Sequence, residues 1–167
     1  MLEKKIKAVK LVAVNCEGVL TDGQFSFTKN GEETISFSGK DVFGFKLLAD
    51  TSGVNIVLIN SERTTPFLRF ALKLGLDDRY LGIEKNLAFI DQLKSNYDVD
   101  AMQIAYIGCE LDDLQMMRQV GFSICPLDAA YEVRNTANYV CNSCSGSGVV
   151  REIADLFIVK GASENIS

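Results

Sequence analysis

The chain has 167 residues, a hydrophobic fraction of 47% and a formal net charge of −5 at pH 7. This length favours a single domain with a sizeable core, and the acidic balance argues against nucleic acid or an anionic membrane surface as a partner. The sequence contains no histidine, which removes the commonest general base and with it most zinc sites and Ser-His triads.

The N-terminal stretch and the cysteines indicate a cytoplasmic protein. No apolar run is long enough to span a bilayer. The basic start is followed by a short apolar run and then by Asn15, Cys16 and Glu17 instead of a small-residue cleavage site, so we expect no signal peptide. The five cysteines are odd in number and scattered, which suits reduced thiols in a cytoplasm.

Strand and helix signals alternate along the chain, beginning with a buried strand. Residues 8–14, AVKLVAV, form an apolar, β-rich run that is typical of a strand buried on both faces. Residues 24–37 predict a β-hairpin, because apolar and polar residues alternate on both sides of Asn30 and Gly31. That dipeptide favours a type I′ turn.

The remaining elements predict a sheet with helices on both faces. In chain order they are a helix over 40–53, a strand over 54–60, a helix over 64–75, a short strand over 79–82, a helix over 84–97, a strand over 103–108, a helix over 111–121, a strand over 122–126, a helix over 128–137, a strand over 139–142 and a helix over 148–159. Repeated strand–helix units predict a parallel sheet. We expect one domain over 1–159 and a flexible tail over 160–167.

Polar side chains gather in four loops of this predicted sheet. Ligands of such folds bind at the carboxyl ends of the strands, so these loops are the candidate site. They carry, in chain order, Asn15, Glu17, Thr21 and Asp22; then Ser61, Glu62 and Arg63; then Lys85; then Cys109, Glu110, Asp112 and Asp113.

These loops, in this order, resemble the haloacid dehalogenase (HAD) superfamily of aspartate-based phosphatases. The closer match is its capless branch of 3-deoxy-D-manno-octulosonate 8-phosphate and sialic-acid-type 9-phosphate phosphatases. That branch opens with D-x-D-G-V-x-T-D-G and a β-hairpin, where this chain has NCEGVLTDG and its predicted hairpin. Its S/T-G-R, lysine, YIGDDxxD and G-G-x-G-x-x-R-E motifs correspond here to NSER, EKN, YIGCELDD and SGSGVVRE.

The resemblance runs from about residue 7 to about residue 158 and implies a fold and a set of roles. The implied fold is α/β and Rossmann-like: a parallel sheet flanked by helices, with a β-hairpin flap at 24–37 and no cap domain. The implied nucleophile position is Asn15 and the acid/base position is Glu17. The implied phosphate or substrate positions are Ser61, Arg63, Lys85 and Arg151. The implied Mg²⁺ positions are Asn15, Glu17, Cys109, Glu110 and Asp113.

Several of these positions depart from the family pattern. The amide of Asn15 is a poor nucleophile and cannot form an acyl phosphate that regenerates the same residue. Glu17 keeps a carboxylate but adds a methylene, and the thiol of Cys109 is a poor match for Mg²⁺. Glu62 adds charge and bulk where the family has glycine. We therefore expect a weakened Mg²⁺ site and a degenerate, catalytically impaired phosphatase of the octulosonate and sialic-acid type.

The resemblance also implies partners. The C-terminal domain of animal CMP-sialic acid synthetase is a degenerate phosphatase that serves assembly, and SER with ALKL (71–74) resembles it. We expect a homotetramer formed through the β-hairpin, with a scaffold, regulatory or sugar-phosphate-binding role and no nucleic-acid or membrane partner.

Two alternative functions stay open. The first is an active Mg²⁺-dependent phosphatase that uses Glu17 and Asp113 around the metal, with direct attack by water. The second is a redox or metal protein that uses Cys141 and Cys144, which would bind zinc or form a disulfide. Cys16 is a poor substitute nucleophile, because successive strand side chains face opposite ways and it should point away from Asn15.

Overall fold

The computed structural model describes residues 1–161, and its centre is a five-stranded sheet in the order β4-β1-β5-β6-β7. All neighbouring strands run parallel. The strands are β1 (Leu11–Asn15), β4 (Asn55–Ile59), β5 (Ile104–Ile107), β6 (Phe122–Cys125) and β7 (Tyr139–Val140). Every residue of β1, β5 and β6 is buried, so the prediction of apolar strands buried on both faces is confirmed.

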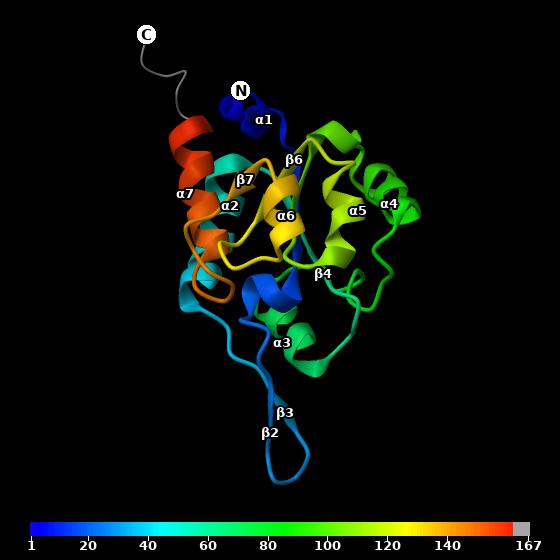
Figure 1. Cartoon of the computed structure of the whole chain (residues 1–167), viewed down its shortest axis with the longest axis vertical. Coiled ribbons are helices and arrows are strands. Elements are labelled where there is room, and N and C mark those ends of the chain that lie inside the picture. Colours follow the sequence, from blue (N-terminus) through cyan, green and yellow to red (C-terminus); the bar gives the residue numbers. More distant parts are fainter. Residues whose placement is uncertain (162–167) are drawn as a thin grey trace.

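Helices cover both faces of this sheet (Figure 1). Helices α1 (Leu2–Ala8), α2 (Gly39–Ser52) and α7 (Val149–Gly161) gather on one side, where α2 packs along α7. Helices α4 (Leu87–Tyr97), α5 (Leu114–Met117) and α6 (Tyr131–Thr136) lie on the other side, and α3 (Thr65–Leu74) follows β4. Short 3₁₀ turns span Ala101–Gln103 and Leu111–Asp113. The predicted α/β fold with a parallel sheet is therefore confirmed.

Strands β2 (Ser26–Phe27) and β3 (Glu33–Thr34) form an antiparallel hairpin that projects beyond the sheet (Figure 1). The turn differs from the predicted type I′. The Gly31 N–H donates to the Thr28 carbonyl at 2.9 Å, and the Thr28 N–H donates to the Glu32 carbonyl at 2.9 Å. Gly31 has a φ of 83°, but Asn30 does not share the positive φ that a type I′ turn requires. The loop is a type I turn followed by a left-handed glycine.

Capping residues in the sequence correctly predicted where helices α2 and α3 begin and end. The side chain of Ser38 accepts from the Lys40 N–H at the start of α2, and Gly53 ends that helix in the left-handed region at φ 63°. Pro66 sits in the first turn of α3, and Gly75 ends α3 with φ 66°. The predicted helices over 40–53 and 64–75 are therefore confirmed to within a residue or two.

Three predicted elements differ from the structure. The predicted strand over 8–14 begins only at Leu11, because residue 8 belongs to helix α1, which the sequence analysis did not predict and in which Glu3 and Lys7 form an i,i+4 ion pair at 3.0 Å. The predicted strand over 79–82 is only an isolated bridge between Asn60 and Leu81. The predicted helix over 111–121 breaks into a 3₁₀ turn and the four-residue α5.

The C-terminal boundary also lies later than expected. Helix α7 runs to Gly161, so the first two residues of the predicted flexible tail, 160 and 161, are helical. The rest of that predicted tail, 162–167, lies outside the described residues. Within the described part of the chain, the helices are all too short or too polar to cross a membrane.

Candidate functional site

A cavity of about 590 Å³ lies where β1, β4 and β5 end. The chain passes from β1 to β4 on one side of β1 and later returns to β5 on the other, so this is the point where the strand order reverses. The cavity is lined by residues from all the loops that the sequence singled out: Asn15, Glu17, Gly18, Gly23, Asn60, Ser61, Glu62, Lys85, Glu110, Leu111 and Asp112.

Two side chains converge on one backbone carbonyl at the centre of the site, that of Glu17. The Asn15 Nδ2 donates to the Glu17 oxygen at 2.7 Å, and the Cys109 thiol donates to the same oxygen at 3.4 Å. Burial raises the pKa of Cys109, and the nearby Asp113 and Glu110 carboxylates raise it further. The thiol is therefore protonated and able to donate.

This arrangement fixes the orientation of the Asn15 amide. The reverse assignment would place two acceptor oxygens 2.7 Å apart, so Nδ2 must face the Glu17 carbonyl. The other amide atom, Oδ1, is buried and has no hydrogen-bond partner among the described residues. A buried acceptor left unpaired costs about 1–3 kcal/mol, so such a group calls for a donor.

Asn60 holds the two acidic loops of the site together, a role that the sequence reading did not assign. Its Oδ1 accepts from the Glu17 N–H at 3.1 Å, and its Nδ2 donates to the Glu62 carbonyl at 3.0 Å. Asn60 is buried where β4 ends, as Asn15 is where β1 ends. One pattern in the sequence could have indicated this role. The apolar runs of β1 and β4, which pair as neighbours, both lead into an asparagine at the carboxyl end.

Asp113 anchors the opposite wall of the site. Its Oδ1 accepts from the Tyr106 hydroxyl at 2.5 Å and from Lys85 Nζ at 2.8 Å. Its Oδ2 accepts from the backbone N–H groups of Cys109 at 2.8 Å and Glu110 at 3.0 Å. Both oxygens are thus fully engaged by donors of the protein itself, which satisfies a fully buried carboxylate.

Lys85 is the cation of the cavity, and its charge is already matched. Its Nζ contacts Asp113 at 2.8 Å and Asp112 at 2.9 Å. Burial lowers the pKa of Lys85, but the ion pairs with Asp113 and Asp112 outweigh burial and raise the pKa above its usual value. Lys85 therefore stays charged and forms ion pairs with two carboxylates of the protein itself.

The side chains at the implied metal positions do not fit Mg²⁺. The ion requires near-octahedral oxygen ligands, whereas both Asp113 oxygens are occupied and Cys109 is a protonated thiol. Within residues 1–161, no three His, Cys, Asp or Glu side chains are grouped so that they could hold a metal. The five implied metal positions are neighbours in the fold but do not form a ligand set.

The cavity is acidic. Glu17, Glu62, Glu110 and Asp112 all line it, while its lysine is paired. Partial burial raises the pKa of Glu17, and the carboxylates of Glu62 and Glu33 raise it further. A phosphate dianion would meet the same repulsion that Glu17 meets from its neighbours.

Comparison with known proteins agrees with this fold. A family model described as a haloacid dehalogenase-like hydrolase matches residues 81–153. The 3-deoxy-D-manno-octulosonate 8-phosphate phosphatase of Haemophilus influenzae is 35% identical over 94% of this chain and 87% of its own length. The chain belongs to the haloacid dehalogenase-like hydrolases.

Two further relatives extend the comparison. The crystal structure of the octulosonate phosphatase from Moraxella catarrhalis, in complex with magnesium, phosphate and KDO, has a TM-score of 0.89 at 29% identity and covers 95% of this chain and 91% of its own. The N-acylneuraminate cytidylyltransferase of Oncorhynchus mykiss is 32% identical over 90% of this chain but only 35% of its own length.

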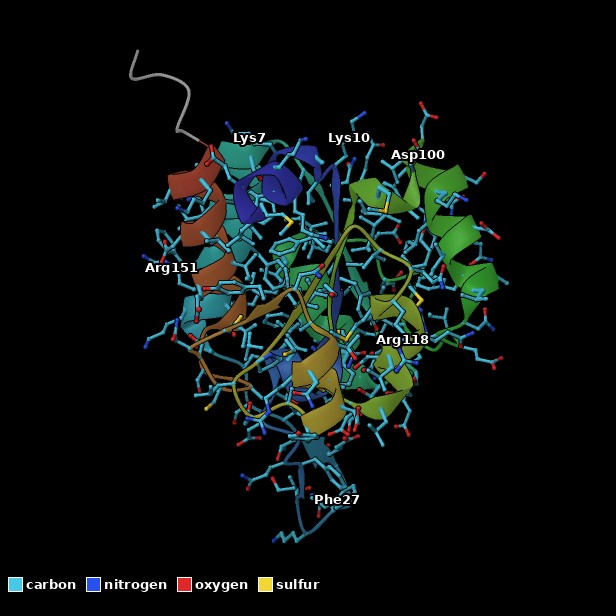
Figure 2. All side chains as sticks on the ribbon, turned by 45° about the horizontal axis from the view of Figure 1, so that its top comes forward. Lys7, Lys10, Phe27, Asp100, Arg118 and Arg151 are labelled. Carbon is cyan, nitrogen blue, oxygen red and sulfur yellow. The ribbon has the colours of Figure 1, made fainter. Side chains whose placement is uncertain are left out.

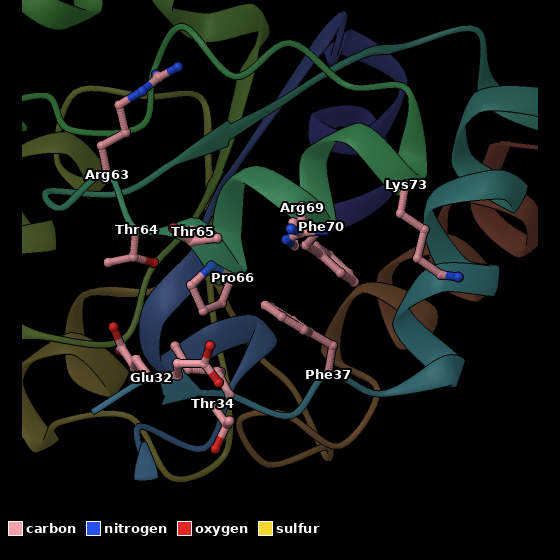
Figure 3. Close-up of a pocket in the computed structure, with 12 residues that line it drawn as sticks. Glu32, Thr34, Phe37, Arg63, Thr64, Thr65, Pro66, Arg69, Phe70 and Lys73 are labelled. Carbon is pink, nitrogen blue, oxygen red and sulfur yellow. The ribbon is translucent and has the colours of Figure 1, made fainter. Parts of the chain in front are cut away.

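The haloacid dehalogenase resemblance assigned phosphate to Ser61, Arg63, Lys85 and Arg151, and the structure brings only half of this set together. Ser61 and Lys85 line the cavity. Arg63 Nη2 pairs with Asp78 at 2.8 Å, and its side chain extends away from the others labelled in Figure 3. Arg151 projects from α7, where it pairs with Asp155 at 3.0 Å (Figure 2). Neither arginine is among the described residues of the cavity wall.

A second hollow of about 910 Å³ separates the hairpin from α3 (Figure 3). Phe37 stacks on Phe70 at its base, with ring centroids 4.1 Å apart. On the hairpin itself, Phe25 and Phe27 are 59% and 65% exposed and contact each other edge to face. Two large aromatic side chains in solvent on a small projecting hairpin are typical of an interaction surface.

No disulfide forms between the cysteines of the described residues. All five, which lie within the described residues, are free thiols. Cys16 is fully buried and burial raises its pKa, so it is inert beside Asn15. Cys141 is buried while Cys144 is half-buried, and the disulfide that the redox alternative needs does not form between them.

Proposed function

We propose that this chain is a catalytically impaired member of the octulosonate phosphatase group of haloacid dehalogenase-like hydrolases, and that it acts as an assembly protein. The observation that carries the proposal is the Asn15 amide at the nucleophile position, with its Nδ2 committed to the Glu17 carbonyl at 2.7 Å. An amide in this state offers phosphorus no anionic attacking atom.

The neighbouring groups do not replace that nucleophile. The Cys109 thiol is protonated and donates to the same carbonyl. The rival mechanism, in which water is activated between Glu17 and Asp113 around Mg²⁺, requires free oxygens on Asp113. Both are occupied by donors from Tyr106, Lys85 and two backbone amides. Catalytic impairment is the reading that these contacts support.

The exposed hairpin supports an assembly role. A two-stranded hairpin is marginal by itself in water, yet this one exposes Phe27 in β2 and Phe25 just before β2. Because the two side chains are 59% and 65% exposed, burying them against another copy would remove about 200–300 Å² of their surface from water. We propose that this burial joins four copies into a homotetramer.

Catalysis is tested by phosphate release. The purified chain is incubated with 3-deoxy-D-manno-octulosonate 8-phosphate, or with a sialic-acid-type 9-phosphate, in excess Mg²⁺. Asn15→Ala provides the background, and the phosphatase of Haemophilus influenzae provides the positive control. We expect the chain and Asn15→Ala to give the same rate. A rate well above that of Asn15→Ala overturns the proposal and requires a mechanism without an aspartyl phosphate.

The double variant Asn15→Asp, Cys109→Asp sharpens this test. It restores both lost carboxylates, so turnover in the double variant and not in the parent chain would trace the impairment to these positions.

Assembly is tested separately by light scattering during size-exclusion chromatography. We expect a tetramer that dissociates in the Phe25→Ser, Phe27→Ser variant, with Leu72→Ser, another exposed apolar residue, as the matched control. A monomeric parent chain would refute the assembly role.

A further inference from the structure

The hollow between the hairpin and α3 has walls of opposite charge (Figure 3). The hairpin wall carries the carboxylates of Glu32 and Glu33, and the α3 wall carries the cations Arg69 and Lys73, which are about one helical turn apart. Among the described residues, none forms an ion pair with any of these four side chains, whereas Arg63 at the same hollow is already paired. The walls therefore hold opposite charges that the chain itself leaves unpaired.

An apolar floor lies between these walls. Phe37 stacks on Phe70 with ring centroids 4.1 Å apart, and Ile35 and Pro66 line the hollow beside them. Ile35, Phe37 and Pro66 are only partly buried by this chain, and the hollow above them has a volume of about 910 Å³. A partly exposed apolar centre with charged edges is typical of a surface that contacts another protein.

The opposite charges make the hollow complementary to a second copy of itself. A rotation of 180° about an axis that points out of the hollow exchanges its two walls. In two copies related by such an axis, the acidic hairpin wall of each copy faces the basic α3 wall of the other. The same charges are then matched twice, which is what a two-fold contact between identical surfaces requires.

The proposed tetramer needs a contact of this kind. Phe25 and Phe27 of two copies together would bury about 400–600 Å², whereas specific interfaces bury about 1,200–2,000 Å². A two-fold contact also joins only two copies, so a closed tetramer built from such contacts needs two different ones. The hollow is continuous with the surface that carries the two rings, because Glu33, Ile35 and Thr64 line both the hollow and the smaller cavity beside the rings.

We propose that the hollow is a second contact surface of the assembly, at which Glu32 and Glu33 of one copy pair with Arg69 and Lys73 of another, and reciprocally. This inference rests on the assembly role proposed above and adds the surface and the charges that select the partner. The occupant is another copy and not a small anion, because an anion bound at the α3 cations would also face the hairpin carboxylates. Complementary charges at an interface fix its register and exclude wrong partners.

The test is a charge swap between copies, followed by light scattering during size-exclusion chromatography. The variant Arg69→Glu, Lys73→Glu makes both walls of the hollow acidic. The variant Glu32→Lys, Glu33→Lys makes both walls basic. Two copies of either variant repel each other at this contact, but an acidic and a basic copy attract each other when the variants are mixed in equal amounts.

Two further variants control for net charge and for folding. Lys46→Glu, Arg118→Glu reverses two exposed cations that lie outside the hollow and should leave the tetramer intact. Arg69→Gln, Lys73→Gln removes the two α3 charges without adding repulsion, so it should weaken the tetramer less and should make its dissociation less sensitive to salt. Circular dichroism confirms that each variant is folded.

We expect each reversed variant to lose the tetramer, with a dissociation constant at least about tenfold above that of the parent chain, and the equal mixture to recover it. If both reversed variants stay tetrameric while Phe25→Ser, Phe27→Ser dissociates, this contact is refuted and the assembly role stands. Loss of the tetramer without recovery in the mixture also refutes the contact, because charges that pair within one chain are not rescued by another. A monomeric parent chain refutes both.

Discussion

The carboxylate of Asp113 should be the most important single polar group for the stability of this protein. It is completely buried and accepts from the Tyr106 hydroxyl, from Lys85 Nζ and from the backbone amides of Cys109 and Glu110. Replacement by alanine removes the acceptor from all four donors at once. We predict that Asp113→Ala is strongly destabilising, independently of any activity.

The magnitude follows from what the variant leaves behind. The Lys85 side chain is only 5% exposed, and after the change its remaining ion-pair partner among the described residues is Asp112, which is 59% exposed. Removing one member of a buried ion pair costs about 3–5 kcal/mol. We therefore expect a loss of about 4 kcal/mol, a large share of the ~5–15 kcal/mol that stabilises a typical domain. For a chain of this size that corresponds to a fall in melting temperature of roughly 8–16 °C.

The assay is urea unfolding followed by circular dichroism, with Asp112→Ala as the matched control. Asp112 contacts the same lysine from an exposed position, so its removal should cost no more than about 1 kcal/mol. If Asp113→Ala does not fold, Tyr106→Phe removes one donor from the same carboxylate and should cost about 1–2 kcal/mol. Equal losses for Asp113→Ala and Asp112→Ala would refute the reasoning.

Other predictions concern packing, thiols and pH. A Cβ on Gly44 would lie 2.6 Å from the Arg151 backbone nitrogen of α7, so Gly44→Ala should lower the free energy of unfolding by about 1–3 kcal/mol, whereas Gly39→Ala, with open space around it, should not. Cys144 is the one thiol that is not buried, so a thiol reagent should label one cysteine quickly in the native chain; two fast labels would contradict this. Burial raises the pKa of Tyr97 and of Tyr139 to about 12 each, against about 10 in an unfolded chain. Their contribution to stability is complete below pH 10 and should be lost between pH 10 and 12, and a flat stability in that window would contradict the assignment.

Most of the fold could be predicted because it depends on local patterns. The apolar run before Asn15 indicates a strand buried on both faces. The glycines at the ends of α2 and α3 indicate where each helix stops. Helix α1 was not predicted, because its main sequence signal is one i,i+4 ion pair that stands beside a stronger strand pattern. The hairpin was found but its turn was not, because Asn30-Gly31 can adopt either turn and only the backbone around Thr28 decides between them.

The site was predicted less completely, because a side chain's position in a motif does not reveal its partner. Lys85 and Ser61 are in the cavity as expected, but Arg63 is held by Asp78, fifteen residues further along the chain. Nothing in the local sequence around Arg63 indicates that contact. The role of Asn60 was missed for the same reason, since its partners belong to the loops of Glu17 and Glu62.

The two substitutions that remove carboxylates from this site are structurally linked. Asn15 and Cys109 lie on neighbouring strand ends, and both donate to the carbonyl of Glu17. Aspartates at both positions would instead place two carboxylates beside the Glu17 carbonyl oxygen. A cation would then be needed to offset the repulsion among these oxygens. With an amide and a thiol, the carbonyl is satisfied by the protein itself, and the Asp113 network holds the opposite wall. Donors from the protein itself therefore satisfy both the Glu17 carbonyl and the Asp113 carboxylate in this structure.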